Sequence, residues 1–232
     1  MRYYLFKKIN NKYIMKLVYF NARGLAETSR LLLAVNSVDY EDFRYPLKIN
    51  DWATHDMERV EFLKDKENNK LLGSLNKLPF LEIDGQVIPQ SKSVERFLAK
   101  KYNMFGDNDL DAGRIDGICE YVRDFKDAYQ SVRKLKDDEK EKGMEKWFNE
   151  TLPEKLKLLD NILCKEHELF SVGTRLSLAD VVLYNFITQF FDNKDGAMNS
   201  TQHSPKLVKL INHVSDLESI KKWLKTRPET PF

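Results

Sequence analysis

The 232-residue sequence has little cysteine and no long hydrophobic run. Its two cysteines, Cys119 and Cys164, form no CxxC pair and are too few for a disulfide framework or a zinc site. The longest apolar stretch, residues 178–191, is interrupted by polar side chains and is shorter than the roughly twenty residues that a membrane-spanning helix requires. We therefore expect no metal, no membrane anchor and a reducing compartment such as the cytosol.

An excess of charge of either sign is also missing. Lys and Arg total 38 and Asp and Glu total 36, so the formal net charge is +2. Such a balance creates no field that would concentrate nucleic acid, and we expect no nucleic-acid partner. The sequence also lacks metal-ligand spacing, a nucleotide-binding loop and a serine-hydrolase arrangement, and its 4 histidines are scattered.

Residues 1–14 are basic and lack the apolar core of a secretory signal. They can be read as a poor signal or transit sequence, or as a less structured extension. We favour the extension. Met15 stands where the first predicted strand begins and could serve as an alternative start.

The first part of the chain alternates between strand and helix patterns. Strand signals recur at residues 17–20, 39–45, 78–83 and 86–88. Helix signals follow the first and the last of these strands, at residues 25–35 and 91–102. A polar stretch, residues 52–66, separates the two halves and is interpreted as irregular or helical. The order βαβ, connector, ββα predicts an α/β domain with a mixed sheet.

The second part of the chain is helical throughout. Apolar side chains step by three and four along its first long helix, at Ile115, Ile118, Val122, Phe125, Tyr129 and Val132. Further helices are predicted at residues 140–163, 178–191, 206–213 and 217–225. The pair Ser177 and Asp180 has the spacing of a capping box, which satisfies the first backbone N–H groups of a helix. These patterns predict an all-helical domain.

Tyr19 lies at the junction between the first predicted strand and the first predicted helix. A side chain there faces a helix N-terminus, which favours anions. A neutral tyrosine hydroxyl in this place can donate a hydrogen bond to a thiolate. Taken alone, such a tyrosine is more often one more aromatic residue on a half-buried strand. A second segment changes that interpretation, because it carries Lys77-Leu78-Pro79 and, after a hairpin, Gln90-Ser91.

These two segments, residues 16–27 and 77–91, resemble the cytosolic glutathione S-transferases, most closely the tyrosine-dependent, sigma-like branch. The resemblance covers nearly the whole chain. It implies a thioredoxin-like domain at residues 15–102, an all-helical domain at residues 103–232 that contributes the electrophile pocket, and an N-terminal extension at residues 1–14. It also implies glutathione as co-substrate, no metal, and a cytoplasmic homodimer.

The resemblance assigns glutathione contacts to both domains. The expected residues are Tyr19, Trp52, Lys77, Leu78, Pro79, Gln90, Ser91 and Asp124. Tyr19 would stabilise the thiolate, which is the competent nucleophile. Pro79 corresponds to a cis-proline that exposes the backbone of Leu78, and Asp124 to an aspartate that reaches glutathione in the neighbouring subunit. No cysteine precedes residue 119, which argues against the cysteine-type thioltransferases.

Several of these residues also have plainer interpretations. Lys77 and Trp52, taken singly, are more often a solvated charge and a packing residue. The resemblance places both at the glycyl end of glutathione. Ser91 is also an ordinary helix N-cap, a role that is compatible with holding the γ-glutamyl carboxylate together with Gln90.

The acceptor pocket is expected to combine residues beside Tyr19 with aromatic side chains of the long helix: Phe20, Ala22, Leu25, Tyr121, Phe125 and Tyr129. The same side chains can be read as core between the domains. Leu25 stands where prostaglandin-isomerising members carry a basic residue, which disfavours that specialised activity. Nearby, we expect Arg23 to support the loop and Glu27 to pair with it or with another basic residue.

The leading interpretation is a glutathione S-transferase that conjugates the thiolate to small hydrophobic electrophiles in detoxification. A dedicated glutathione-dependent isomerase or hydroperoxide peroxidase is an alternative that the sequence does not separate. Another is a non-catalytic glutathione-binding protein, against which the presence of Tyr19, Gln90 and Ser91 argues. A third is an adaptor that binds a partner through residues 60–70, part of a segment that looks longer than in many relatives.

Overall fold

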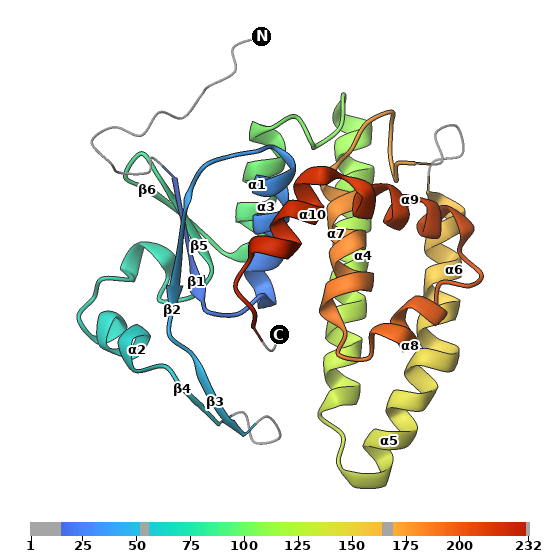
Figure 1. The fold of residues 1–232 in the computed structure, drawn as a ribbon, viewed down its shortest axis with the longest axis horizontal. Coiled ribbons are helices and arrows are strands. Elements are labelled where there is room, and N and C mark those ends of the chain that lie inside the picture. The colour runs from blue at the N-terminus through green and yellow to red at the C-terminus, as the bar shows by residue number, and fades with distance from the viewer. Residues whose placement is uncertain (1–14, 52–55, 164–168, 231–232) are drawn as a thin grey trace. The chain divides into compact units, whose positions relative to one another are not determined.

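The computed structural model describes residues 15–51, 56–163 and 169–230. The chain divides into two compact units (Figure 1). One runs to Leu98 and also includes the C-terminal residues from Trp223, and the other is Ala99–Lys222. The domain boundary expected after residue 102 lies close to this division, whereas the end of the chain groups with the first unit.

A four-stranded sheet forms the centre of the first unit. Its strands are β1 (Met15–Phe20), β2 (Glu41–Tyr45), β5 (Phe80–Ile83) and β6 (Gln86–Pro89), in the order β2-β1-β5-β6. Strand β1 pairs parallel to β2 and antiparallel to β5, and β6 pairs antiparallel to β5. The mixed sheet that the sequence predicts is confirmed.

Both faces of this sheet are covered. Leu17 and Val18 point to opposite faces of β1, and both are buried. Val18 packs in a cluster with Phe62 of helix α2 (Val60–Glu67), while α1 (Glu27–Val35) buries Leu31, Leu32 and Leu33. Figure 1 shows α1 and α3 (Ser91–Lys101) together on one side of the strands and α2 on the other.

A second, two-stranded sheet corrects the prediction for residues 52–66. Strands β3 (Lys48–Asp51) and β4 (Asp56–Glu58) pair antiparallel, and only after them does the predicted helix appear as α2. The hairpin was missed because its strands are polar and short and show no apolar alternation. A cross-strand ion pair connects them, with the Lys48 ammonium 2.8 Å from a Glu58 carboxylate oxygen.

The second unit is helical. Its helices are α4 (Asp109–Arg133), α5 (Asp137–Lys146), α6 (Leu152–Ile162), α7 (Leu178–Asn185), α8 (Lys194–Asn199) and α9 (Pro205–Asp216), and α10 (Glu218–Thr226) leads back to the first unit. The long helix is confirmed as α4. One predicted helix is interrupted by a π-helical turn at Trp147–Thr151, and another ends in a π-helical turn at Phe186–Phe190. Helix α8 was not predicted because six residues with one buried alanine give no periodic signal.

The capping box is confirmed at the start of α7. The backbone N–H of Ser177 donates to one oxygen of Asp180 at 2.7 Å, and the N–H of Ser171 donates to the other at 2.6 Å. Asp180 is completely buried, so these donors replace the water that it would otherwise bind. Within the described ranges, no helix is both long enough and apolar enough to cross a membrane.

Candidate functional site

The sheet register brings several predicted glutathione residues to one end of the first unit's sheet. One row of paired residues crosses three neighbouring strands there: Val18 in β1, Phe80 in β5 and Pro89 in β6. Tyr19, Pro79 and Gln90 are each one residue beyond this row, and Leu78 and Ser91 follow one residue further. Because neighbouring strands are about 4.8 Å apart, these residues converge on one small region.

Tyr19 is the best-defined member of this group. Its side chain is buried, with 8% of its surface exposed, and its hydroxyl oxygen accepts a hydrogen bond of 3.2 Å from the backbone N–H of Leu25. The oxygen is the acceptor, so the hydroxyl hydrogen can be donated to a ligand. Burial raises the pKa of Tyr19, while the Leu25 N–H and the Arg30 charge oppose that rise. The phenol therefore stays protonated at neutral pH, as a donor must.

Gly24 allows the loop to approach the Tyr19 hydroxyl. Its φ of +38° is unfavourable for residues with a side chain, and a Cβ at this position would lie 2.7 Å from the Tyr19 oxygen. Our sequence reasoning did not single out this glycine. The signal was available, because a glycine between a strand and a helix often marks a close backbone approach.

Arg30 holds the backbone of the same loop by hydrogen bonds. This role was not predicted from the sequence either. Arg30 is completely buried on α1, and its Nη1 donates to the carbonyl oxygen of Ala22 at 2.6 Å and to that of Arg23 at 3.5 Å. Its Nε donates to Asp42 at 3.2 Å. The guanidinium carbon lies 6.0 Å from the centre of the Tyr19 ring, so Arg30 places a positive charge near the site.

Glu27 has basic partners, as we expected, and they are Arg30 and Arg227. Its carboxylate lies 3.6 Å from Arg30 Nη1 and 2.6 Å from Arg227 Nη1. The spacing of three residues between Glu27 and Arg30 on one helix was the signal for this pair. The contribution of Arg227, from the end of the chain, has no local signal.

The segment before β5 contains three further predicted residues. The peptide bond between Leu78 and Pro79 is cis, as the resemblance implied. Lys77 is exposed and follows two left-handed residues, Leu75 with a φ of 58° and Asn76 with a φ of 55°. This sharp turn leads the chain into β5. Trp52, the other residue expected at the glycyl end of glutathione, lies outside the described residues.

Gln90 and Ser91 form the turn from β6 into α3. Gln90 is exposed and left-handed, with a φ of 72°, and its carbonyl oxygen accepts a 3.0 Å hydrogen bond from Val94 N. Ser91 is half-buried and is the first residue of α3. The N-terminal N–H groups of an eleven-residue helix therefore lie at the same end of the sheet as Tyr19 and Pro79.

The residues predicted for the acceptor pocket differ in exposure. Close to Tyr19 along the chain, Phe20 is half-buried, Ala22 is buried and Leu25 is 54% exposed. The Phe20 ring contacts Phe62 of α2, with ring centres 5.2 Å apart. Leu25 thus presents its side chain at the surface while its backbone holds the Tyr19 hydroxyl.

The four predicted residues on α4 also divide into two groups. Asp124 is exposed and Tyr121 is half-buried, whereas Phe125 and Tyr129 are at most 1% exposed. The rings around Tyr129 belong to its own unit, with Phe191 nearest at 4.9 Å between ring centres. Phe125 and Tyr129 therefore serve the core of the helical unit, and their part in an acceptor pocket stays a prediction.

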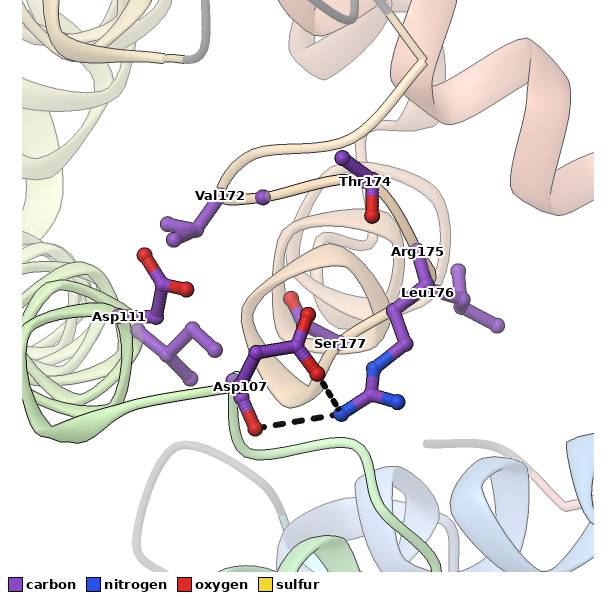
Figure 2. A pocket seen from close by; sticks show the side chains of 10 residues that line it. Asp107, Asp111, Val172, Thr174, Arg175, Leu176 and Ser177 are labelled. Atoms are coloured by element: carbon purple, nitrogen blue, oxygen red, sulfur yellow. Dashed lines mark hydrogen bonds and ion pairs between the residues drawn. The ribbon is translucent and has the colours of Figure 1, made fainter.

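The second unit also contains a small hollow, shown in Figure 2, between the loop before α4 and the loop before α7. It encloses about 10 Å³, which is room for about one water molecule. Arg175 closes it by an ion pair with Asp107 at 2.5 Å and a hydrogen bond to the carbonyl oxygen of Gly106 at 3.3 Å. None of the predicted site residues lines this hollow, which is a structural junction.

Comparison with known proteins identifies the family. The N-terminal domain model of glutathione S-transferases matches residues 15–100, and the C-terminal domain model matches residues 123–227. A protein of Caenorhabditis elegans, glutathione S-transferase P 10, is 33% identical over 171 residues, which cover 74% of this chain and 73% of that protein. The chain belongs to the glutathione S-transferase family.

Two further relatives span nearly the whole chain. Hematopoietic prostaglandin D synthase of Gallus gallus is 30% identical over 93% of this chain and 97% of its own length. The crystal structure of monomeric Na-GST-3, a glutathione S-transferase of the hookworm Necator americanus, is 27% identical, covers 94% of this chain and 99% of its own, and superimposes with a TM-score of 0.78.

Family membership agrees with the fold. A thioredoxin-like domain with a mixed sheet and a helical domain is the glutathione S-transferase architecture. The protein is a glutathione S-transferase-type enzyme, and glutathione is the substrate that its family shares. Within the described residues no three or more His, Cys, Asp or Glu side chains are grouped so that they could hold a metal ion.

Proposed function

We propose that the protein activates the thiol of glutathione through the Tyr19 hydroxyl and conjugates the thiolate to small hydrophobic electrophiles. The position of the hydroxyl carries the proposal. Its oxygen accepts the Leu25 N–H and its hydrogen remains for the sulfur. Lowering a thiol pKa by about two units corresponds to about 2.7 kcal/mol, which a charge-assisted hydrogen bond and a helix N-terminus can together supply.

The rest of glutathione would extend along the end of the sheet. Gln90 and Ser91, at the start of α3, would hold the γ-glutamyl carboxylate. The backbone of Leu78 would pair with the cysteinyl residue, with Pro79 beside it. Lys77 and Trp52 would bind the glycyl carboxylate. The shared end of β1, β5 and β6 supports this placement.

The electrophile would be bound beside the sulfur by the side chains of Phe20, Ala22 and Leu25, with Tyr121 from α4. Phe125 and Tyr129 would form the wall behind Tyr121. This assignment draws on residues from both domains, residues 15–102 and 103–232.

We further infer a cytoplasmic homodimer in which Asp124 reaches the ammonium of glutathione bound to the neighbouring subunit. The exposure of Asp124 supports this role. The hookworm relative is monomeric, so the oligomeric state is a direct test. Sedimentation of the full chain distinguishes the two states, and a stable monomer with full activity would remove the role of Asp124 across subunits.

A dedicated isomerase or hydroperoxide peroxidase is the second candidate. A relative that is a prostaglandin D synthase supports it. Leu25 argues against prostaglandin isomerisation, because its exposed side chain is apolar where the resemblance to isomerising members calls for a basic one. Product analysis with an endoperoxide and with a lipid hydroperoxide separates these reactions from conjugation.

The test is conjugation of glutathione to chlorodinitrobenzene over a range of pH, with glutathione binding measured in parallel. Replacing Tyr19 by Phe removes the donor, so the pKa of the bound thiol rises by about two units. Less thiolate is then present at pH 7, and kcat/KM falls about 100-fold while glutathione binding persists. Tyr45→Phe is the matched control, because its hydroxyl donates to Asp65 on α2. An active Tyr19→Phe enzyme would refute the role of the phenol. Binding without turnover of this or a hydroperoxide substrate in the unaltered protein would favour a binding protein.

A further inference from the structure

The end of the chain supplies two hydrogen-bond donors to a buried carboxylate on the helix that follows Tyr19. The carboxylate belongs to Glu27, the first residue of α1, which is 1% exposed. One of its oxygens accepts from the indole Nε1 of Trp223 at 3.0 Å and from Nη1 of Arg227 at 2.6 Å. All three residues belong to the first unit, although the donors follow Glu27 by 196 and 200 positions.

A continuous series of contacts leads from this carboxylate to the Tyr19 hydroxyl. The second oxygen of Glu27 lies 3.6 Å from Nη1 of Arg30. The same nitrogen donates to the carbonyl oxygen of Ala22 at 2.6 Å. Ala22 begins the short loop that ends with Leu25, whose N–H donates to the Tyr19 oxygen at 3.2 Å. The buried charges of Glu27 and Arg30 thus determine where the loop lies.

The charge balance of this network depends on Arg227. Glu27 and Arg30 are both withdrawn from water, and a buried ion stays in place only when opposite charges and hydrogen bonds compensate it. Without Arg227, Glu27 would have Arg30 as its main compensating charge. Arg30 would then be drawn toward Glu27, and its bond to the Ala22 carbonyl would weaken.

We propose that Arg227 and Trp223 are positioning residues, which act through Glu27 and Arg30 to hold the Leu25 N–H against the Tyr19 oxygen. The proposal rests on the thiolate-stabilising function of Tyr19 proposed above. A hydroxyl that accepts a hydrogen bond donates its own hydrogen more strongly, because hydrogen bonds in a chain polarise one another. Loss of the Leu25 contact therefore weakens thiolate stabilisation and raises the pKa of the bound thiol.

The experiment uses the full chain with Arg227→Leu. We measure kcat/KM for chlorodinitrobenzene from pH 5.5 to 9.5, and the ultraviolet absorbance of the bound thiolate over the same range. The thiol pKa rises by about half a unit to one unit, so kcat/KM at pH 6.5 falls about three- to tenfold and returns to within about twofold at pH 9.5. The dissociation constant of glutathione, referred to active sites, changes less than about twofold.

Matched variants separate this role from simple stabilisation of the fold. Lys225→Leu removes an exposed positive charge from the last turn of α10, two residues before Arg227, and leaves the pH profile unchanged. Arg227→Lys retains a positive charge and restores part of the shift. Trp223→Phe removes one donor with little loss of ring and shifts the pKa by about 0.3 unit. This milder change decides the question if Arg227→Leu fails to fold.

A double variant ties the effect to Tyr19. In a Tyr19→Phe background, Arg227→Leu produces no further shift of the thiol pKa, because the group through which it acts is gone. Two outcomes overturn the proposal: lower stability with an unchanged pH profile, or an additive effect in the double variant. If Tyr19→Phe alone leaves the profile unchanged, the proposed function fails, which distinguishes its failure from that of the positioning role.

Discussion

The loop beside Tyr19 and the aromatic core around Tyr129 both bury a tyrosine, but they hold it in different ways. The Tyr19 hydroxyl is fixed by one backbone N–H, and the loop that provides it is fixed by buried charges on Arg30 and Glu27. The Tyr129 ring is enclosed by other rings with centres 4.9 to 5.9 Å away, those of Trp147, Phe148, Phe190 and Phe191.

This difference determines what a substitution should damage. Hydrogen bonds and ion pairs are directional, and removing one partner leaves a buried group uncompensated. Apolar contacts are numerous and individually weak, and they respond mainly to lost volume. We therefore expect changes in the loop to alter the chemistry first and changes in the aromatic core to alter stability first.

The largest expected effect is on the stability of the helical unit. Replacing Tyr129 by Ala removes a fully buried ring and leaves a cavity, so the free energy of unfolding falls by about 3–5 kcal/mol. Guanidinium unfolding measures this loss. Tyr129→Phe retains the ring and should leave both stability and the KM for chlorodinitrobenzene nearly unchanged. A selective change in that KM would instead show that the Tyr129 hydroxyl contacts the electrophile.

Local sequence patterns predicted most of the architecture. The apolar periodicity of α4 extends over enough residues to identify a helix without ambiguity. The capping box indicates where α7 begins. The pairing of β3 with β4 could not be predicted in this way, because both strands are short and mostly polar and are stabilised by pairing with each other. The π-helical turns were also hidden, because a one-residue insertion barely disturbs the apolar pattern.

The candidate site was predictable only in part. The resemblance named the residues at the ends of β1, β5 and β6, and the sheet register places them together. It did not reveal what holds Tyr19 in place. Gly24 carries a local signal that could have been used, whereas the contact between Glu27 and Arg227 joins residues 200 positions apart. No periodic or local pattern encodes such a contact.

Gly24→Ala tests the loop beside Tyr19, and its expected effect is smaller than that of Tyr129→Ala. The new Cβ would lie 2.7 Å from the Tyr19 oxygen, and the buried ring must move to relieve that contact. We expect kcat to fall about tenfold, which corresponds to about 1.4 kcal/mol, with glutathione affinity nearly retained.

Gly85→Ala is the matched control for this substitution. Its φ of +75° imposes a comparable backbone cost of roughly 1 kcal/mol, but a Cβ there would meet nothing within 4 Å. Unfolding measurements should show the backbone cost in both variants and a further loss of stability in Gly24→Ala, where the buried ring must also move. Equal losses of kcat would mean that backbone strain, and not the displaced hydroxyl, limits activity.

The smallest expected effect is on the ionisation of the two buried tyrosine hydroxyls. Burial raises the pKa of Tyr129 to about 12, and it also raises the pKa of Tyr19, where the Leu25 N–H and the Arg30 charge oppose the rise. Both groups have a folded-state pKa above the ordinary value of about 10, so their contribution to stability is complete below that pH and is lost as the pH rises through the raised values.

The pH profile of conjugation should therefore rise as the thiol ionises and then stay level to about pH 10, because Tyr19 still carries its proton. Ultraviolet difference titration of the unaltered protein against Tyr19→Phe isolates the phenolate signal of Tyr19. We expect the Tyr19 phenolate above the ordinary pH range and at a lower pH than the phenolate of Tyr129. The reason is that a backbone N–H lowers the pKa of Tyr19, whereas no such hydrogen bond lowers the pKa of Tyr129. A phenolate below pH 9 would show that hydrogen bonding and charge outweigh burial, and Tyr19 would then act on the thiol as a base.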